Sequence, residues 1–176
     1  MSDAEVGVGR EQRELTLSNG SLVLAKPIEA EDASALKRLY ERLSERTLFF
    51  RFFQPRHELT DEQAHRLTHL DGKSRFALVA LDPKDPQEII AVVRYEGNLG
   101  SNRAEYAALV EDRWQESELG LKLTEWLVEA ARERGIELLY AEVLADNKRM
   151  INLFRDLGLP EHTKREDRME QIEIEL

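Results

Sequence analysis

Residues 106–134 read YAALVEDRWQESELGLKLTEWLVEAARER, and the fold can be inferred outward from them. Their apolar start predicts a strand through Val110, and the later apolar residues recur at helical spacing up to Arg134. Between the two lies the polar segment QESELG, residues 115–120. The first N–H groups of a helix lack an intrahelical acceptor and carry partial positive charge, so such a junction binds anions. The stretch therefore predicts a phosphate site at the start of a long helix.

The composition favours one compact domain and excludes several classes of protein. With 176 residues, of which 41% are hydrophobic, the chain suits a flexible tail over residues 1–14 and a single domain over residues 15–176. A net charge of −10 argues against a nucleic-acid partner, because such proteins bind phosphates through Lys and Arg. The absence of cysteine excludes disulfides and thiolate catalysis.

Neither a membrane span nor a metal site is expected. No apolar run approaches the roughly 20 residues that a span needs, and the N-terminus lacks a basic and then apolar signal sequence, so a cytoplasmic protein is expected. His65 and His69 have the i, i+4 spacing of metal ligands but lack the intervening Glu of a metalloprotease helix. A structural or solvent-facing role is the favoured interpretation of this pair.

The first half of the chain is expected to hold a hairpin and three helices. The Asn-Gly pair at residues 19–20 lies between two apolar segments and predicts a type I′ turn. Apolar residues at helical spacing predict a helix over residues 30–43. Ser44 is a suitable N-cap for a second helix, and Thr60 with Gln63 forms a capping box for a third.

Four phenylalanines, Phe49, Phe50, Phe52 and Phe53, fall in the second helix. Two interpretations are open: they anchor the helix in the core, or they form an exposed binding patch. Core anchoring is favoured, because large aromatic side chains contribute most when buried.

The second half is dominated by strands. Two apolar runs joined by a Pro-containing turn, followed by a third strand, predict an antiparallel meander, and Gly135 is a suitable C-terminal stop for the long helix. The expected elements are strands over residues 76–81, 89–93, 103–110, 138–143 and 164–176, and a further helix over residues 147–157.

Several separated motifs occur in the order found in one enzyme superfamily. They are LS at 43–44, RFF at 51–53, LTDEQ at 59–63, LTHLD at 67–71, ALVA at 77–80, AEYA at 104–107, DRWQ at 112–115 and VLADN at 143–147. Together with the order of elements they resemble the GNAT N-acetyltransferases, and most closely the acetyltransferase domain of bacterial protein lysine acetyltransferases. The resemblance implies an α/β (α+β) fold with a mixed, mostly antiparallel central sheet flanked by four to five helices.

The resemblance also implies transfer of an acetyl group from acetyl-CoA to a protein lysine or another primary amine. Glu105 matches the general base, although a solvent-facing strand carboxylate is the alternative interpretation. The Val110 N–H matches the donor to the thioester carbonyl. Asn147 matches a residue beside the pantetheine arm, and it equally suits the N-cap of its helix. The cofactor-binding residues implied are Leu109, Val110, Gln115, Glu116, Ser117, Glu118, Leu119, Gly120, Leu121, Asn147 and Phe154.

Four positions depart from the family pattern in a way that affects chemistry. Phe154 stands where many relatives have a tyrosine general acid, and it cannot protonate a thiolate. Glu118 replaces the central glycine of the diphosphate loop, Glu116 stands where another glycine is common, and Ser117 where a basic residue is common. A glutamate at positive φ costs on the order of 1 kcal/mol. A carboxylate about 4 Å from a phosphate oxygen costs about 1–4 kcal/mol more. Acetyl-CoA affinity roughly tenfold to a thousandfold below that of a glycine loop is expected.

The same two carboxylates support an alternative function. In the first turn of a helix without ligand, Glu116 and Glu118 interact favourably with the helix dipole, and Lys122 one turn later offsets part of their charge. A catalytically weakened or inactive GNAT-like domain that binds a protein or another ligand is therefore the second hypothesis.

Overall fold

The computed structural model describes residues 11–54 and 58–176. Eight strands form one sheet in the order β1-β2-β3-β4-β5-β6-β8-β7, and all neighbours are antiparallel except the parallel pair β5–β6. The mixed, mostly antiparallel sheet expected from the sequence is confirmed. The strands are β1 (Arg13–Thr16), β2 (Leu22–Pro27), β3 (Arg75–Asp82), β4 (Asp85–Gly97), β5 (Arg103–Val110), β6 (Leu138–Leu144), β7 (Glu161–Glu166) and β8 (Met169–Glu175).

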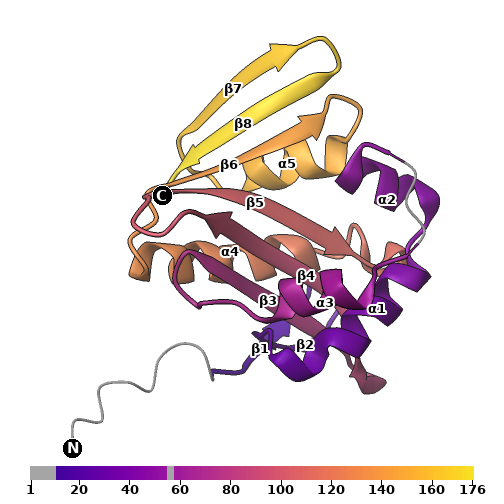
Figure 1. Cartoon of the computed structure of the whole chain (residues 1–176). Helices are drawn as coiled ribbons and strands as arrows, with labels where there is room; N and C mark the ends of the chain where they lie inside the picture. The colour runs from indigo at the N-terminus through magenta and orange to yellow at the C-terminus, as the bar shows by residue number, and fades with distance from the viewer. Residues whose placement is uncertain (1–10, 55–57) are drawn as a thin grey trace, which may run out of the picture.

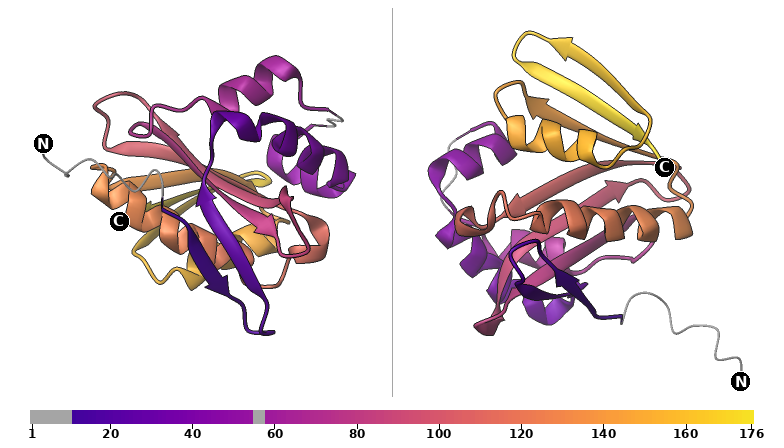
Figure 2. Two further views of the ribbon diagram at one scale, coloured as in Figure 1. Left: turned by 90° about the horizontal axis from the view of Figure 1, so that it is seen from below. Right: turned by 180° about the vertical axis from the view of Figure 1, so that it is seen from behind.

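Helices cover both faces of the sheet (Figures 1 and 2). The helices α4 (Leu119–Glu133) and α5 (Lys148–Asp156) lie on one face, and α1 (Ala33–Arg42) and α3 (Asp61–Thr68) lie on the other. Each side has its own apolar core, one built around Leu123, Leu127 and Phe154 and the other around Leu36, Leu39 and Val79. The helix α2 (Glu45–Phe52) lies beside the ends of β5 and β6 in Figure 1. Among the described residues, no helix is long and apolar enough to cross a membrane.

The N-terminal hairpin is confirmed, but its turn and its starting point differ from expectation. Gly20 has φ +86°, whereas Asn19 is outside the positive-φ region, so the turn is not type I′. The first strand begins at Arg13, two residues inside the expected flexible tail, because Arg13 is held on α4. Its guanidinium lies 4.5 Å from the Trp126 ring centroid, and Nη1 is 2.8 Å from Oε2 of Glu129. Residues 1–10 of the expected tail lie outside the described residues.

The expected caps of α2 and α3 are confirmed. The Ser44 hydroxyl accepts a hydrogen bond from the Thr47 N–H, and Thr60 with Gln63 forms the full capping box. The interpretation of the phenylalanines as core anchors is confirmed for Phe52, which packs against the core around Leu36 and Leu39, and is wrong for Phe49 and Phe53. Leu48 is the buried residue of α2, whereas Phe49 and Phe53 are 43% and 39% exposed, because α2 lies at the end of the sheet and buries only a narrow stripe.

The C-terminal segment also differs from expectation. One strand was expected over residues 164–176, but the chain forms the hairpin β7–β8 there. All six residues of β7 are exposed, so the sequence of this edge strand carries no alternation of apolar and polar residues.

Candidate active site

The parallel strands β5 and β6 separate beside the polar loop of residues 115–120. They pair only from Arg103 to Glu105, opposite Leu138 to Tyr140, and then diverge toward α2 (Figure 1). A cavity of ≈ 410 Å³ lies at the divergence, lined by β5, β6, α2, α5 and the start of α4. This volume lies in the range of small-molecule sites, roughly 300–1,000 Å³.

The backbone of β5 directs N–H groups into this gap. The Glu111 N–H donates to the Ile90 carbonyl at 2.8 Å, which makes these two residues a hydrogen-bonded pair between neighbouring strands. Because such pairs alternate along an antiparallel ladder, the N–H groups of Ala108 and Val110 point away from β4, toward the gap. The Val110 carbonyl, which points the same way, accepts a hydrogen bond of 2.9 Å from Nε2 of Gln115.

Glu105 stands where the two strands begin to separate. It is exposed, lines the cavity, and is the last β5 residue paired with β6. In the sheet register it lies between Glu96 of β4 and Tyr140 of β6, so the three side chains share one face. Glu142, two residues beyond Tyr140, is exposed on the same face and also lines the cavity.

The loop before α4 adopts backbone angles typical of glycine at two positions that are glutamate. Glu116 has φ +63° and Glu118 has φ +70°, both in the left-handed region. Glu118 is the N-cap of α4, and neither carboxylate lies in the first turn as expected, because the helix begins at Leu119. Within the described residues the Glu118 side chain makes no capping hydrogen bond. The first N–H groups of α4 are therefore not satisfied by their own N-cap side chain.

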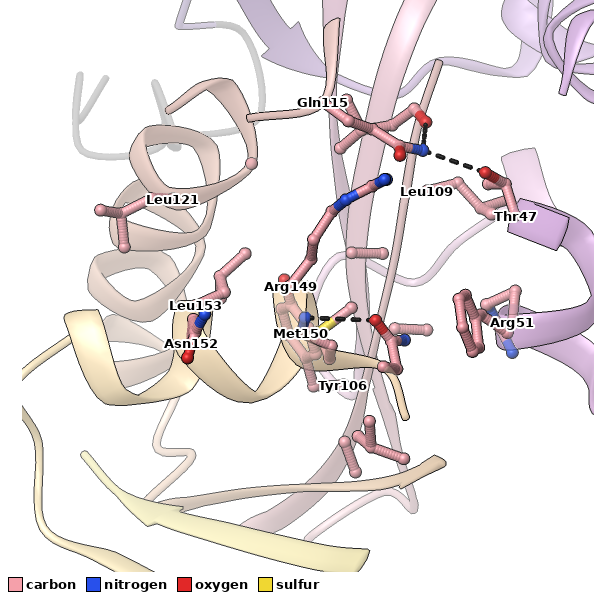
Figure 3. Close-up of a pocket in the computed structure, with 18 of the residues that line it drawn as sticks. Thr47, Arg51, Tyr106, Leu109, Gln115, Leu121, Arg149, Met150, Asn152 and Leu153 are labelled. Carbon is pink, nitrogen blue, oxygen red and sulfur yellow. Dashed lines mark hydrogen bonds between the residues drawn. The ribbon is translucent and has the colours of Figure 1, made fainter. Parts of the chain in front are cut away.

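A hydrogen-bond network ties this loop to α2. Asp112, just after β5, accepts hydrogen bonds from the backbone N–H of Ser44 at 3.0 Å and from its hydroxyl at 2.6 Å. The Thr47 hydroxyl donates to Asp112 at 3.1 Å and accepts from Nε2 of Gln115 at 3.0 Å (Figure 3). Burial alone would raise the pKa of Asp112, but the hydrogen bonds from Ser44 and Thr47 outweigh it and hold the pKa below the ordinary 3.8. The start of α2 and the loop of residues 115–120 therefore form one hydrogen-bonded unit.

The α5 side of the cavity begins with a satisfied cap. Oδ1 of Asn147 accepts a hydrogen bond of 3.3 Å from the Met150 N–H, so Asn147 caps the helix and also lines the cavity. Two residues later, Nε of Arg149 lies 3.6 Å from Oε1 of Glu116 on the loop. The sequence pointed to Lys122 as the neutralising cation, but the ion pair that the loop makes is with Arg149.

The structure brings most of the predicted residues together. Those that line the cavity are Glu105, Leu109, Val110, Gln115, Glu116, Glu118, Gly120, Leu121 and Asn147. Ser117, Leu119 and Phe154 lie elsewhere: the Ser117 hydroxyl donates to the Trp114 carbonyl, and Leu119 and Phe154 are fully buried in the core.

Thr47, Arg51, Ala108 and Arg149 also line the cavity, although none was among the predicted site residues. Thr47, Arg51 and Arg149 come from helices distant in sequence from the loop, so no spacing pattern could associate them with it. For Ala108 a signal did exist, because it has the same parity along the strand as Val110.

No group of three metal-ligating side chains occurs within residues 11–54 and 58–176. The His65 and His69 rings stack with their centroids 3.6 Å apart, and Nδ1 of His69 is 2.8 Å from the His65 carbonyl oxygen. The pair therefore packs on its own helix.

Comparison with known proteins gives a consistent family. The model of the acetyltransferase (GNAT) family matches residues 36–159. An acetyltransferase from Pseudomonas aeruginosa is 28% identical over 144 residues, which cover 81% of this chain and 77% of that protein. The GNAT domain of PAT from S. lividans is 34% identical, with a TM-score of 0.86 over 94% of this chain and 97% of that domain.

A cAMP-binding acyltransferase from Mycobacterium smegmatis, 21% identical, shares the fold with a TM-score of 0.67, and the match covers 94% of this chain and 47% of that one. The family match extends over the diverging strands, the loop and the start of α5, which together enclose the cavity. The chain belongs to the GNAT acetyltransferase family.

Proposed function

We propose that this protein transfers an acetyl group from acetyl-CoA to a lysine amine of a protein, with Glu105 as general base. The observation that carries the proposal is the cavity at the β5–β6 divergence, which has Glu105 at its edge and the diphosphate loop on its wall. The similarity to the GNAT domain of PAT supports an acceptor of this class.

The acceptor amine must lose a proton before it can attack. A lysine ammonium in water has a pKa of about 10.4, so a carboxylate in direct or water-mediated reach accelerates the step. Glu105 is exposed beside the cavity, where Glu142 adds negative charge that favours a cationic side chain. Glu96 on the same face is already paired with Arg75 at 3.6 Å and with Arg94 at 4.0 Å. The free amine then forms a bond to the thioester carbonyl carbon, and the attacking nitrogen loses its second proton to water. The C–S bond breaks, and CoA leaves as a thiolate that takes a proton from solvent.

The thioester oxygen gains negative charge as the amine attacks, and a backbone N–H stabilises it. Family resemblance selects Val110 for this role. On an extended strand, however, Val110 lies about 16 Å from Glu105, whereas Ala108 lies about 10 Å away. The shorter separation suits an amine held between the base and the thioester, so strand geometry favours the Ala108 N–H, with Val110 further along the pantetheine arm.

The replacement Glu105→Gln tests the base. It should lower turnover at neutral pH by about 100-fold while changing acetyl-CoA affinity less than twofold, because general-base catalysis contributes roughly 10²–10⁴-fold. The assay is acetylation of a lysine-containing peptide, with calorimetric titration of acetyl-CoA. Glu166→Gln, which removes an exposed strand carboxylate from the outer strand β7, is the matched control. An unaltered rate in Glu105→Gln would remove Glu105 as the base.

A second candidate function is favoured by the two carboxylates of the loop. Glu116 and Glu118 are both exposed where a diphosphate would be bound, as in a GNAT-like domain that binds a protein or another ligand without catalysis. Titration of the natural chain with acetyl-CoA separates the two functions. Micromolar binding supports the acetyltransferase, and binding no tighter than millimolar supports the non-catalytic module.

A further inference from the structure

We propose that Arg149 is the cation that binds phosphate in this site. A basic loop residue is common at the position of Ser117, and Arg149 supplies the missing positive charge from α5. The inference rests on the proposed function, since the phosphate belongs to acetyl-CoA. Arg149 lines the cavity, and its side chain points from the start of α5 toward Gln115 of the loop (Figure 3).

The charges around the cavity leave few cations for an anionic ligand. Among the described lining residues, the cationic side chains are Arg51 and Arg149, whereas Glu105, Glu116, Glu118, Glu142 and Asp156 are carboxylates. Arg51 belongs to α2, across the cavity from α5 in Figure 3, whereas Arg149 approaches the loop itself. Of these two lining cations, Arg149 is therefore the one placed to pair with a diphosphate held at the start of α4.

The present partner of Arg149 can be exchanged for a phosphate. The Arg149–Glu116 distance of 3.6 Å is longer than a direct hydrogen bond, and the two side chains are 52% and 79% exposed. Ion pairs this exposed contribute little, whereas a guanidinium can donate two parallel hydrogen bonds to phosphate oxygens. Glu116 is thus a weakly bound partner of the Arg149 guanidinium in the absence of ligand, and it competes with the phosphate for it.

The base of Arg149 is fixed relative to the loop. Asn147 caps the helix from which Arg149 projects. The same helix packs closely on α4, since a Cβ atom built at Gly120 would lie 3.4 Å from Cδ1 of Leu153. A guanidinium on this helix therefore reaches the loop without a shift of secondary structure.

The test is calorimetric titration of acetyl-CoA into the full chain and its variants. Arg149→Ala should weaken binding at least tenfold, and Glu116→Gln should strengthen it severalfold because the competing carboxylate is gone. Lys148→Ala is the matched control, since Lys148 is the neighbouring exposed cation of α5 and does not line the cavity; it should change affinity less than twofold.

A second probe shows whether the phosphate is the group recognised. Acetyl-pantetheine carries the same thioester without the diphosphate, so Arg149→Ala should leave its rate of acetyl transfer within twofold of the natural chain. An equal loss with both donors, or an acetyl-CoA affinity unchanged in Arg149→Ala, overturns the role of Arg149 and leaves the acetyltransferase function standing. Failure of the natural chain to bind acetyl-CoA at all would instead overturn both.

Discussion

Two helix N-termini face the same cavity, and they differ in their N-caps. At the start of α5, Oδ1 of Asn147 accepts the hydrogen bond of the Met150 N–H. At the start of α4, the N-cap is Glu118 at φ +70°, whose side chain makes no such bond within the described residues. The α5 terminus is satisfied by its own chain, whereas the α4 terminus keeps its N–H groups available. The two ends therefore differ in whether an N-cap side chain occupies the N–H groups of the first turn.

The α4 end also stores backbone strain. A non-glycine residue at positive φ costs on the order of 1 kcal/mol, and both Glu116 and Glu118 adopt such angles. The missing cap forgoes roughly a further 1 kcal/mol that a Ser or Asn would supply in ordinary cap geometry. The loop therefore retains the conformation of a glycine cradle at a cost in stability. Because the backbone angles are already those of glycine at both positions, we expect charge to decide whether the loop binds phosphate.

Glu118→Gln removes that charge and keeps the side-chain length. It should tighten acetyl-CoA binding about fivefold to tenfold, the value for one carboxylate near a phosphate in a largely aqueous setting. Glu118→Gly should bind equally well but unfold with a free energy higher by on the order of 1 kcal/mol, because only glycine relieves the positive φ. Titration calorimetry and denaturant unfolding measure the two effects separately.

Glu125→Gln, on the exposed side of the same helix, controls for the change in net charge. If Glu125→Gln tightens acetyl-CoA binding as much as Glu118→Gln does, the effect comes from the net charge of the protein. The contrast between the two helix ends then disappears. If Glu118→Gly alone tightens binding, strain and not charge limits the loop.

Asn147→Ala should disrupt the other terminus. Loss of the acceptor for the Met150 N–H should lower the free energy of unfolding by about 1 kcal/mol. Asn147→Ser retains a capping oxygen and should lose only a few tenths of that amount. The same pair of variants separates the role of Asn147 as a helix cap from a contact with acetyl-CoA. If the acetyl-CoA affinity falls in both variants, although Asn147→Ser keeps the cap, Asn147 contacts the ligand. Equal instability of both variants would contradict the cap.

The central strand, loop and helix were predictable because each carries a local signal. An apolar run ends at Val110, and an apolar stripe at helical spacing starts at Leu119. The polar segment between them is only long enough for a connecting loop. The caps at Ser44, Thr60 and Asn147 were likewise visible, because a cap joins residues three apart in sequence.

The features that could not be predicted are of two kinds. Some depend on contacts between distant parts of the chain, and others on a backbone geometry that several residue types can adopt. Thr47 reaches Gln115 across 68 residues of sequence, and Arg149 reaches Glu116 from another helix. The turn at Gly20 was misjudged because an Asn-Gly pair fits more than one turn type. The strand β7 was missed because, with every residue exposed, it has no buried face to leave a pattern.

Gly120→Ala should have the smallest effect, and it tests how much room the α4 terminus leaves beside the cavity. A Cβ atom at this position would lie 3.4 Å from Cδ1 of Leu153 and 3.5 Å from Cγ2 of Val110, which are ordinary contacts. The variant should therefore gain about 0.5 kcal/mol of helix stability and keep acetyl-CoA affinity within twofold. The same change at Gly97 is the counterexample, because its Cβ would lie 2.7 Å from the Arg103 carbonyl oxygen and force β4 and β5 apart. The opposite result, a stable Gly97→Ala and a destabilised Gly120→Ala, would contradict this expectation. It would mean that α4 and α5 pack more tightly at the cavity than these distances imply, so that α5 closes the α4 terminus to a ligand.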